Sequence, residues 1–360
     1  MKITFVDDNV YAYSAGRPCT LSGAERQLWL LGRALASQGW SVVFGVDQGL
    51  DPGTRKRYDG LEFVGIGGGS ALANWHRFLA SERPDWSYWR GAYHLLGPAV
   101  ELAKSAGART IFAAAFDSDV QPQRALFHRP RLWPFYAWAL ARTDRIFVQH
   151  EGQLANLRRP WRSKASIVYS IAGDAATSKP HRERSPYVAW VGVLRQPKRP
   201  DLLRDIACQA ANVRFVVCGG PSGHRSPPGY GPRMVEALSA LPNVEYLGHV
   251  SPERAHDVMS NAAVLLSTAD EEGFPNTFLQ AWSSGTPVVS LKVDPDRIIA
   301  QRGLGVIAGS VETAVEAIRD LLASADRRDV IGERAVRHVS QAHSAASVTA
   351  AFHRAIGSGR

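Results

Sequence analysis

Two series of alternating strand and helix patterns, separated by one polar stretch, most strongly limit the folds available to this chain of 360 residues. The first series opens with an apolar run over 2–6, a loop, a helical pattern over 24–38 and a second apolar run over 41–46. A strand, a helix and a strand in this order form the parallel unit of a doubly wound sheet. A second series with the same alternation starts at Tyr187. The sequence therefore predicts the α/β fold class, with two Rossmann-like domains.

The polar stretch between the two series marks the expected domain boundary. Residues 173–186 combine small, polar and proline residues without periodicity, as interdomain linkers do. We therefore expect an N-terminal domain over residues 1–175, a linker over 176–186 and a C-terminal domain over 187–340. The remaining residues, 341–360, have a helical pattern.

The stretch 265–290 in the second series has the residue order of an anion-binding turn. Strand-like apolar runs stand at its two ends, and between them come adjacent carboxylates, a Gly-Phe-Pro sequence and a short helical pattern. Asn276 or Thr277 can cap this helix, and Gly285 stands where a glycine ends one. Unpaired backbone N–H groups and the positive end of the helix dipole attract phosphate groups. A ligand with a phosphate and several hydroxyls would suit this turn.

Seven residues of this stretch occur at the spacing of a known motif: Glu272, Gly273, Phe274, Ala281, Gly285, Pro287 and Val288. They resemble the donor-site motif of the retaining GT-B glycosyltransferases of family 4 (glycosyl transferases group 1). One position departs, because Gln280 stands where the family has a second glutamate. The resemblance implies that Glu272 contacts the donor sugar and that Gln280 holds the nucleotide ribose through neutral hydrogen bonds. It also places Pro275, Asn276 and Thr277 in the donor site. The alternative is an ordinary turn between helix and strand whose charges are only solvated.

A basic loop follows the first strand pattern of the second series. It reads Val-Gly192-Val-Leu-Arg195-Gln-Pro-Lys198, which places two cations where the carboxyl edge of a parallel sheet would lie. Arginine can hold phosphate oxygens in bidentate fashion, and lysine acts as a point charge. The resemblance implies that Arg195 and Lys198 clamp the donor diphosphate beside Gly192; the alternative is a solvated turn. By the same resemblance, His249 and Val250, in a later loop, contact the base.

The first series contains two further candidate sites. The sequence around Gly23 resembles the family's glycine loop near the donor phosphates, and the alternative is a plain glycine before a helix. Asp117 and Asp119 follow the apolar run 110–115, at the sheet edge where ligands bind. Family members often carry a His or Asp there that faces the acceptor hydroxyl, which makes Asp117 the candidate; capping of the next loop is the alternative. His150 follows the next strand pattern, and the sequence names no partner for it.

Composition bears mainly on partners. Of the net charge of +9, residues 1–180 carry 22 basic minus 15 acidic residues, or +7, and eight of the ten tryptophans precede residue 162. This suits an anionic or lipid-linked acceptor and peripheral contact with a membrane surface, although the tryptophans could equally be core residues. Nucleic-acid motifs are absent from the sequence, and no apolar run reaches the ~18 residues of a membrane span. The cysteines, Cys19, Cys208 and Cys218, are scattered, which predicts a reducing, cytoplasmic setting, at the inner face of the membrane if that contact exists.

The resemblance as a whole implies the GT-B fold, in which two Rossmann-like domains face each other across a cleft and the last helix crosses back to the first domain. We expect a retaining glycosyltransferase that moves a sugar from a nucleotide-diphosphate sugar to an acceptor hydroxyl, in polysaccharide, glycolipid or glycoconjugate biosynthesis. We expect no cofactor beyond this co-substrate and no metal, since no Asp-x-Asp motif is placed for donor binding and the pattern at 117–119 lies in the first series. The alternatives are a nucleotide-sugar 2-epimerase of the same fold and a non-catalytic nucleotide-sugar binding protein.

Overall fold

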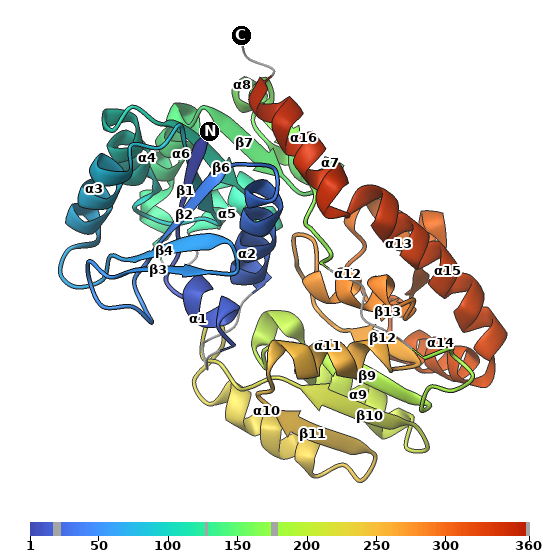
Figure 1. The fold of residues 1–360 in the computed structure, drawn as a ribbon. Helices are drawn as coiled ribbons and strands as arrows, with labels where there is room; N and C mark the ends of the chain where they lie inside the picture. The colour runs from blue at the N-terminus through green and yellow to red at the C-terminus, as the bar shows by residue number, and fades with distance from the viewer. Residues whose placement is uncertain (17–22, 127–128, 174–178, 358–360) are drawn as a thin grey trace. The chain divides into compact units, whose positions relative to one another are not determined.

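The chain folds into two compact α/β units in a computed structural model that describes residues 1–16, 23–126, 129–173 and 179–357 (Figure 1). The first unit comprises Met1–Ile171 together with Ala345–Arg360, and the second comprises Ala172–Ser344. Each unit has its own parallel sheet with helices on both faces, which confirms the predicted fold class.

The sheet of the first unit has eight strands in the order β3-β4-β2-β1-β5-β6-β7-β8. All pairs are parallel except β3, which runs antiparallel to β4 at one edge. The strands are β1 (Lys2–Val6), β2 (Ser41–Val46), β3 (Arg55–Tyr58), β4 (Leu61–Gly65), β5 (Trp86–Arg90), β6 (Arg109–Ala113), β7 (Arg145–Val148) and β8 (Ala165–Ile167).

Helices cover both faces of this sheet because successive residues of each buried strand point to opposite sides. Phe44 packs toward α2 and α16, whereas its neighbour Val43 packs toward α3, α4 and α6. The helices are α1 (Val10–Ser14), α2 (Gly23–Ala36), α3 (Ala71–Glu82), α4 (Leu96–Ser105), α5 (Pro122–Ala125), α6 (Trp133–Arg142), α7 (Glu151–Asn156), α8 (Arg159–Arg162) and α16 (Ala345–Gly357), with the 3-10 turns η1 (Asp117–Val120) and η2 (Pro130–Leu132). Trp75, Trp86 and Trp89 are buried in these layers and are core residues.

The last helix, α16, belongs to the first unit although more than three hundred residues separate it from α2 (Figure 1). Phe352 packs edge-to-face on Trp40, with ring centres 5.8 Å apart. Trp40 Nε1 also donates to His353, at 3.2 Å, and Arg145 Nε donates to the carbonyl of Ala355, at 2.9 Å. These contacts complete the face of the sheet that α2 covers.

The second unit has a six-stranded, wholly parallel sheet in the order β11-β10-β9-β12-β13-β14. Its strands are β9 (Tyr187–Val191), β10 (Arg214–Cys218), β11 (Val244–Gly248), β12 (Val264–Ser267), β13 (Val288–Ser290) and β14 (Gly305–Ile307). Its helices are α9 (Pro200–Gln209), α10 (Tyr230–Ser239), α11 (Pro252–Ser260), α12 (Asn276–Ser283), α13 (Ile298–Arg302), α14 (Val311–Ala323) and α15 (Ala325–Ala342), with the turns η3 (Gln196–Lys198) and η4 (Pro295–Arg297).

The segment expected to be a linker, 176–186, differs from that expectation wherever it is described. Residues 174–178 lie outside the described residues, but the chain after them is packed onto the second unit. Arg184 is buried and donates to the carbonyl of Ser284, at 2.6 Å, and to Thr286 Oγ1, at 2.8 Å. A buried guanidinium needs such acceptors, and they tie the segment to the turn after α12. Polar composition alone therefore did not indicate that residues 179–186 are ordered and packed on the second unit.

Among the residues that the structure describes, no helix combines the length and the apolar character needed to cross a membrane.

Candidate functional site

The predicted donor residues lie in loops that follow β9, β10, β11 and β12 in the second unit. In the strand order, β9 stands between β10 and β12, so the chain leaves β9 toward one edge and returns to β12 on its other side. Open α/β sheets bind ligands at this kind of switch point, beyond the carboxyl ends of the strands. The basic loop follows β9 and the Glu-Gly-Phe turn follows β12, so topology brings these two motifs to one place.

Lys198 and Glu272, which the resemblance assigns to the same ligand, contact each other directly. Lys198 Nζ donates to Glu272 Oε1, and the two side chains are only 23% and 11% exposed. Burial, followed by the positive charge of Arg195, lowers the pKa of Lys198, whereas the Glu272 carboxylate favours the charged ammonium. The structure therefore brings a cation of one motif and the carboxylate of the other into a sheltered ion pair.

Arg195 is the second cation of the same loop, and one of its hydrogen-bond donors lacks an acceptor in the described part of the chain. Its Nε is buried, and none of the described residues accepts a hydrogen bond from it. Burial, and then the charge of Arg225, lowers the pKa of Arg195. Arg225 itself pairs with Glu271, at 3.5 Å. A buried donor without an acceptor is costly, and an anionic ligand would remove that cost. Arg225, which sequence reasoning missed, has no motif that could have revealed it.

The basic loop is held in place by bonds that do not involve these cations. Thr268 Oγ1 donates to the carbonyl of Lys198, at 2.7 Å, and the backbone N–H of Asp270 donates to the carbonyl of Pro197, at 3.0 Å. Arg199 adopts a left-handed backbone conformation and pairs with Asp201, at 2.8 Å. The loop after β9 is thus fixed to the loop after β12, and Arg199 serves this scaffold.

The helix after the turn, α12, starts differently from the sequence expectation. Pro275 is the N-cap residue, and Asn276 and Thr277 are the first two helical residues, so neither of them caps the helix. Pro275, with an extended ψ of 121°, is the last residue outside the helix, so the helix begins at Asn276, at least one residue earlier than a cap at Asn276 or Thr277 would allow. The cap position therefore provides no side-chain acceptor for the first helical N–H groups. Gly285, with φ +72°, follows the C-cap as predicted.

Phe274 is expected in the donor site as part of its motif, but its side chain lies in the core. It is 6% exposed, and its ring lies 4.8 Å from that of His343 and 6.4 Å from that of Trp282. Gly273 and Pro275 beside it are also buried. The Gly-Phe-Pro sequence therefore anchors the turn, and only its backbone is left to meet a ligand.

Gln280 lies partly buried on α12, and its Nε2 stands 3.5 Å from Nδ1 of His256 on α11. This distance is at the limit of a hydrogen bond. The structure thus adds His256, which sequence reasoning did not select, to the surroundings of the predicted ribose-binding residue. A lone histidine in a helical pattern carries no signal that could have identified it.

The glycines after β9 and β10 allow two loops to meet. A Cβ added at Gly219 would lie 1.8 Å from the carbonyl oxygen of Gly192, so only glycine fits there. The Gly219 N–H donates to the carbonyl of Gly248, at 2.7 Å. This bond places the loop that contains His249 and Val250 beside the loop after β10. His249 is exposed and Val250 is partly buried. Both remain candidates for contact with a base.

In the first unit, Asp117 and His150 form a pair that the sequence did not reveal. His150 Nε2 and Asp117 Oδ1 are 2.8 Å apart, and Gln153 Nε2 donates to the same oxygen, at 3.0 Å. His150 is the N-cap of α7, and its Nδ1 accepts from the backbone N–H of Gln153. This acceptor role assigns the proton to Nε2, which donates to Asp117. The two residues follow the adjacent strands β6 and β7.

Asp119, the other carboxylate of this turn, has a structural role. It is 3% exposed and accepts from the backbone N–H groups of Ala115, at 2.7 Å, and Phe116, at 3.0 Å. Burial raises its pKa to about 6. Gly23 is the exposed first residue of α2, and residues 17–22 before it lie outside the described residues.

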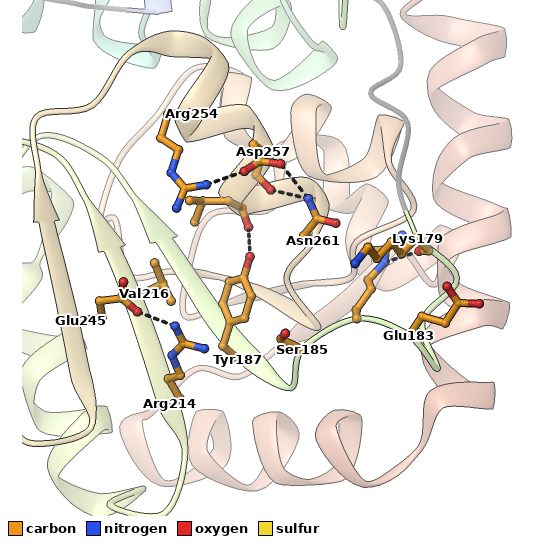
Figure 2. Close-up of a pocket in the computed structure, with 12 residues that line it drawn as sticks. Lys179, Glu183, Ser185, Tyr187, Arg214, Val216, Glu245, Arg254, Asp257 and Asn261 are labelled. Atoms are coloured by element: carbon orange, nitrogen blue, oxygen red, sulfur yellow. Dashed lines mark hydrogen bonds and ion pairs between the residues drawn. The ribbon is translucent and has the colours of Figure 1, made fainter.

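A hollow of about 380 Å³ lies elsewhere in the second unit, among the amino-terminal ends of β9, β10 and β11 (Figure 2). Four of its charged residues pair with one another: Arg214 with Glu245, at 2.5 Å, and Arg254 with Asp257, at 2.6 Å. Because open α/β sheets bind ligands at the opposite, carboxyl edge, the loops described above remain the candidate functional site.

Comparisons with known proteins identify a family model and curated relatives that resemble part of the chain. Residues 185–324 match the family model described as glycosyl transferases group 1, and this range contains the loops after β9 through β12. The D-inositol 3-phosphate glycosyltransferase of Corynebacterium glutamicum is 30% identical over 208 residues, which cover 52% of this chain and 49% of that protein. The chain thus spans about half the length of the curated relatives it matches.

Solved structures share the whole fold at low sequence identity. Sucrose-phosphate synthase from Thermosynechococcus elongatus has a TM-score of 0.79 at 15% identity, with full coverage of both chains. Anabaena HepE, solved in complex with UDP and glucose, has a TM-score of 0.73 at 15% identity, over 99% of this chain and 100% of that one. Two parallel-sheet units with this likeness have the GT-B fold. Within that fold, residues 185–324 are similar to the glycosyl transferases group 1.

Proposed function

We propose that this protein is a retaining glycosyltransferase that moves a sugar from a nucleotide-diphosphate sugar to an acceptor hydroxyl. The observation that carries the proposal is the cluster of Arg195, Lys198 and Glu272 at the carboxyl edge of the second sheet, inside the range that matches the family model. HepE, which has the same fold, was solved with UDP and glucose, and this supports a nucleotide-sugar as the donor.

The proposed mechanism rests on charge. When the bond between the sugar and the phosphate breaks, negative charge accumulates on the diphosphate. Arg195 and Lys198 would stabilise this charge from fixed positions, so that no metal ion or other cofactor is required. Binding of the donor would open the ion pair between Lys198 and Glu272. The ammonium then turns to the phosphate and the carboxylate to the sugar hydroxyls.

The acceptor side of the proposal rests on the first unit. We propose an anionic or lipid-linked acceptor in polysaccharide, glycolipid or glycoconjugate biosynthesis, met in the cytoplasm at the inner face of the membrane. The +7 charge of residues 1–180 supports this proposal. Asp117, with its proton-donating partner His150, is the candidate for holding the acceptor hydroxyl.

The test is the stereochemistry of the transferred sugar. A panel of nucleotide-diphosphate sugars is screened by calorimetry, and the donor that binds is incubated with acceptor extracts. Proton NMR then reports the anomeric configuration of the product and the release of nucleotide diphosphate. We expect the donor's configuration to be retained. An inverted product contradicts the retaining mechanism, and a sugar epimerised at C2 without transfer contradicts the transferase itself.

A further inference from the structure

Helix α6 of the first unit exposes aromatic side chains where a surface helix normally exposes polar ones. Phe135 is 67% exposed, Trp138 46% and Trp133 36%. Phe135 and Trp138, three residues apart, share the outward side of this ten-residue helix with Pro134 and Ala141, and Trp133 is exposed at its first residue. Because single exposed apolar residues are common and contiguous groups are not, this grouping needs an explanation.

Folding of the unit does not supply that explanation. The opposite side of α6 already provides the core contacts, through Tyr136, Ala139 and Leu140, which are buried against the sheet and α4. An amphipathic helix would then have charged or polar residues on its outward side. Here the helix is apolar on both sides, and Phe135, at 67% exposed, buries little of its side chain in the fold.

Phe135 and Trp138 border a hollow of about 560 Å³ between α6 and α4, two helices that lie side by side in Figure 1. His94, Gly97 and Pro98 line it from the α4 side, and Pro134, Phe135 and Trp138 line it from the α6 side. A Cβ at Gly97 would lie 2.7 Å from the Trp138 ring, so this glycine lets the indole rest on α4. The surface formed by Trp133, Pro134, Phe135 and Trp138 is called the α6 face below.

Basic residues surround the α6 face. Residues 121–142 contain four arginines and no acidic residue, but Arg142 is paired with Glu101 of α4, at 2.7 Å; residues 155–164 contain three arginines, one lysine and no acidic residue. The second group adjoins the first, because the Arg158 guanidinium lies 5.9 Å from the centre of the Trp133 ring. Arg129 and Arg131 are exposed just before α6, and burial followed by the charge of Arg129 lowers the pKa of His94 in the hollow. The border of the aromatic surface is therefore cationic.

We propose that the α6 face docks the protein on an anionic lipid surface, with Phe135 and Trp138 entering the headgroup region and the arginines contacting lipid phosphates. Aromatic rings combined with arginines are typical of elements that lie in the membrane interface. A second copy of the chain fits this surface less well, because its cationic border would face an identical one. The inference concerns only this surface and stands whether or not the second unit transfers a sugar.

Flotation of the full chain with lipid vesicles tests the proposal. One vesicle set contains phosphatidylcholine with phosphatidylglycerol, and the other contains phosphatidylcholine alone. We expect the wild type to bind the anionic vesicles and to lose this binding as salt is added. The double variant Phe135→Ser/Trp138→Ser should bind at least about tenfold more weakly. Arg129→Gln and Arg131→Gln should each weaken binding about fivefold and flatten the salt dependence.

The matched control removes two exposed valines from the second unit. Val330 and Val336 on α15 are 50% and 43% exposed, and the variant Val330→Ser/Val336→Ser should bind vesicles like the wild type. Thermal unfolding checks that each variant is folded; if the double variant is not, Phe135→Ser alone replaces it. Equal vesicle binding by the wild type and the aromatic variant overturns the proposal. So does a wild-type dimer that Phe135→Ser dissociates while neither protein binds vesicles, since the α6 face would then join two copies.

Discussion

Replacing Glu272 by glutamine tests the assignment of this residue most sharply. The carboxylate now neutralises Lys198, so donor phosphates must compete with it for the ammonium. Both side chains are largely buried, but water still reaches them and screens their charges. We therefore take the net contribution of the ion pair to stability as about 1 kcal/mol. Glu272→Gln should therefore bind the nucleotide diphosphate alone about fivefold more tightly, because no carboxylate then competes with the phosphates for the Lys198 ammonium.

The same variant should lose turnover. If Glu272 contacts the sugar as the donor bond breaks, the loss of a charged hydrogen bond that strengthens in the transition state should lower kcat about 100-fold or more. Calorimetry measures the affinity for the nucleotide diphosphate. The steady-state release of nucleotide diphosphate from the donor measures kcat. The matched control is Glu271→Gln, which changes the neighbouring carboxylate, whose ion pair is with Arg225, at 3.5 Å.

The control should leave kcat within about threefold of the wild type. Two results would refute the reasoning. If Glu272→Gln binds the diphosphate ten times more weakly, Glu272 positions Lys198 instead of competing for it. If kcat is unchanged, Glu272 does not contact the reacting sugar.

Three further predictions concern metal, ribose and a buried carboxylate. Activity should survive excess EDTA, because Arg195 and Lys198 carry the diphosphate charge; loss on chelation that magnesium or manganese restores would contradict that assignment. Gln280→Leu should weaken nucleotide-diphosphate binding about 10-fold and Gln280→Glu should keep or tighten it, whereas unchanged calorimetric affinity for both would place the ribose elsewhere. Burial raises the pKa of Asp119 to about 6 from 3.8, so the protonated form favours folding and the wild type should lose about 3 kcal/mol of stability as pH rises from about 4 to above 6. Asp119→Asn should lack this fall, and parallel pH dependences in urea unfolding would show that Asp119 is not the group responsible.

The sequence alone was sufficient for those features that depend on local order. Apolar periodicity and glycine positions predicted the two α/β units, because a strand or helix records in its own residues which side is buried. Gly285 at the end of α12 was predictable for the same reason. Arg195 and Lys198 could be assigned to the carboxyl edge of a sheet, since they directly follow the β9 strand pattern. The family resemblance supplied the roles of these residues, which periodicity could not.

Tertiary structure decided which of these residues meet. Lys198 and Glu272 are 74 positions apart, and Asp117 and His150 are 33 apart; their contacts depend on strand order, which no local pattern records. The same reason explains the buried ring of Phe274, which packs on a histidine from the end of α15. It also explains the aromatic side chains of α6. Their sequence is equally compatible with a buried helix, and only the packing of Tyr136 and its neighbours shows which side of the helix the core leaves exposed to solvent.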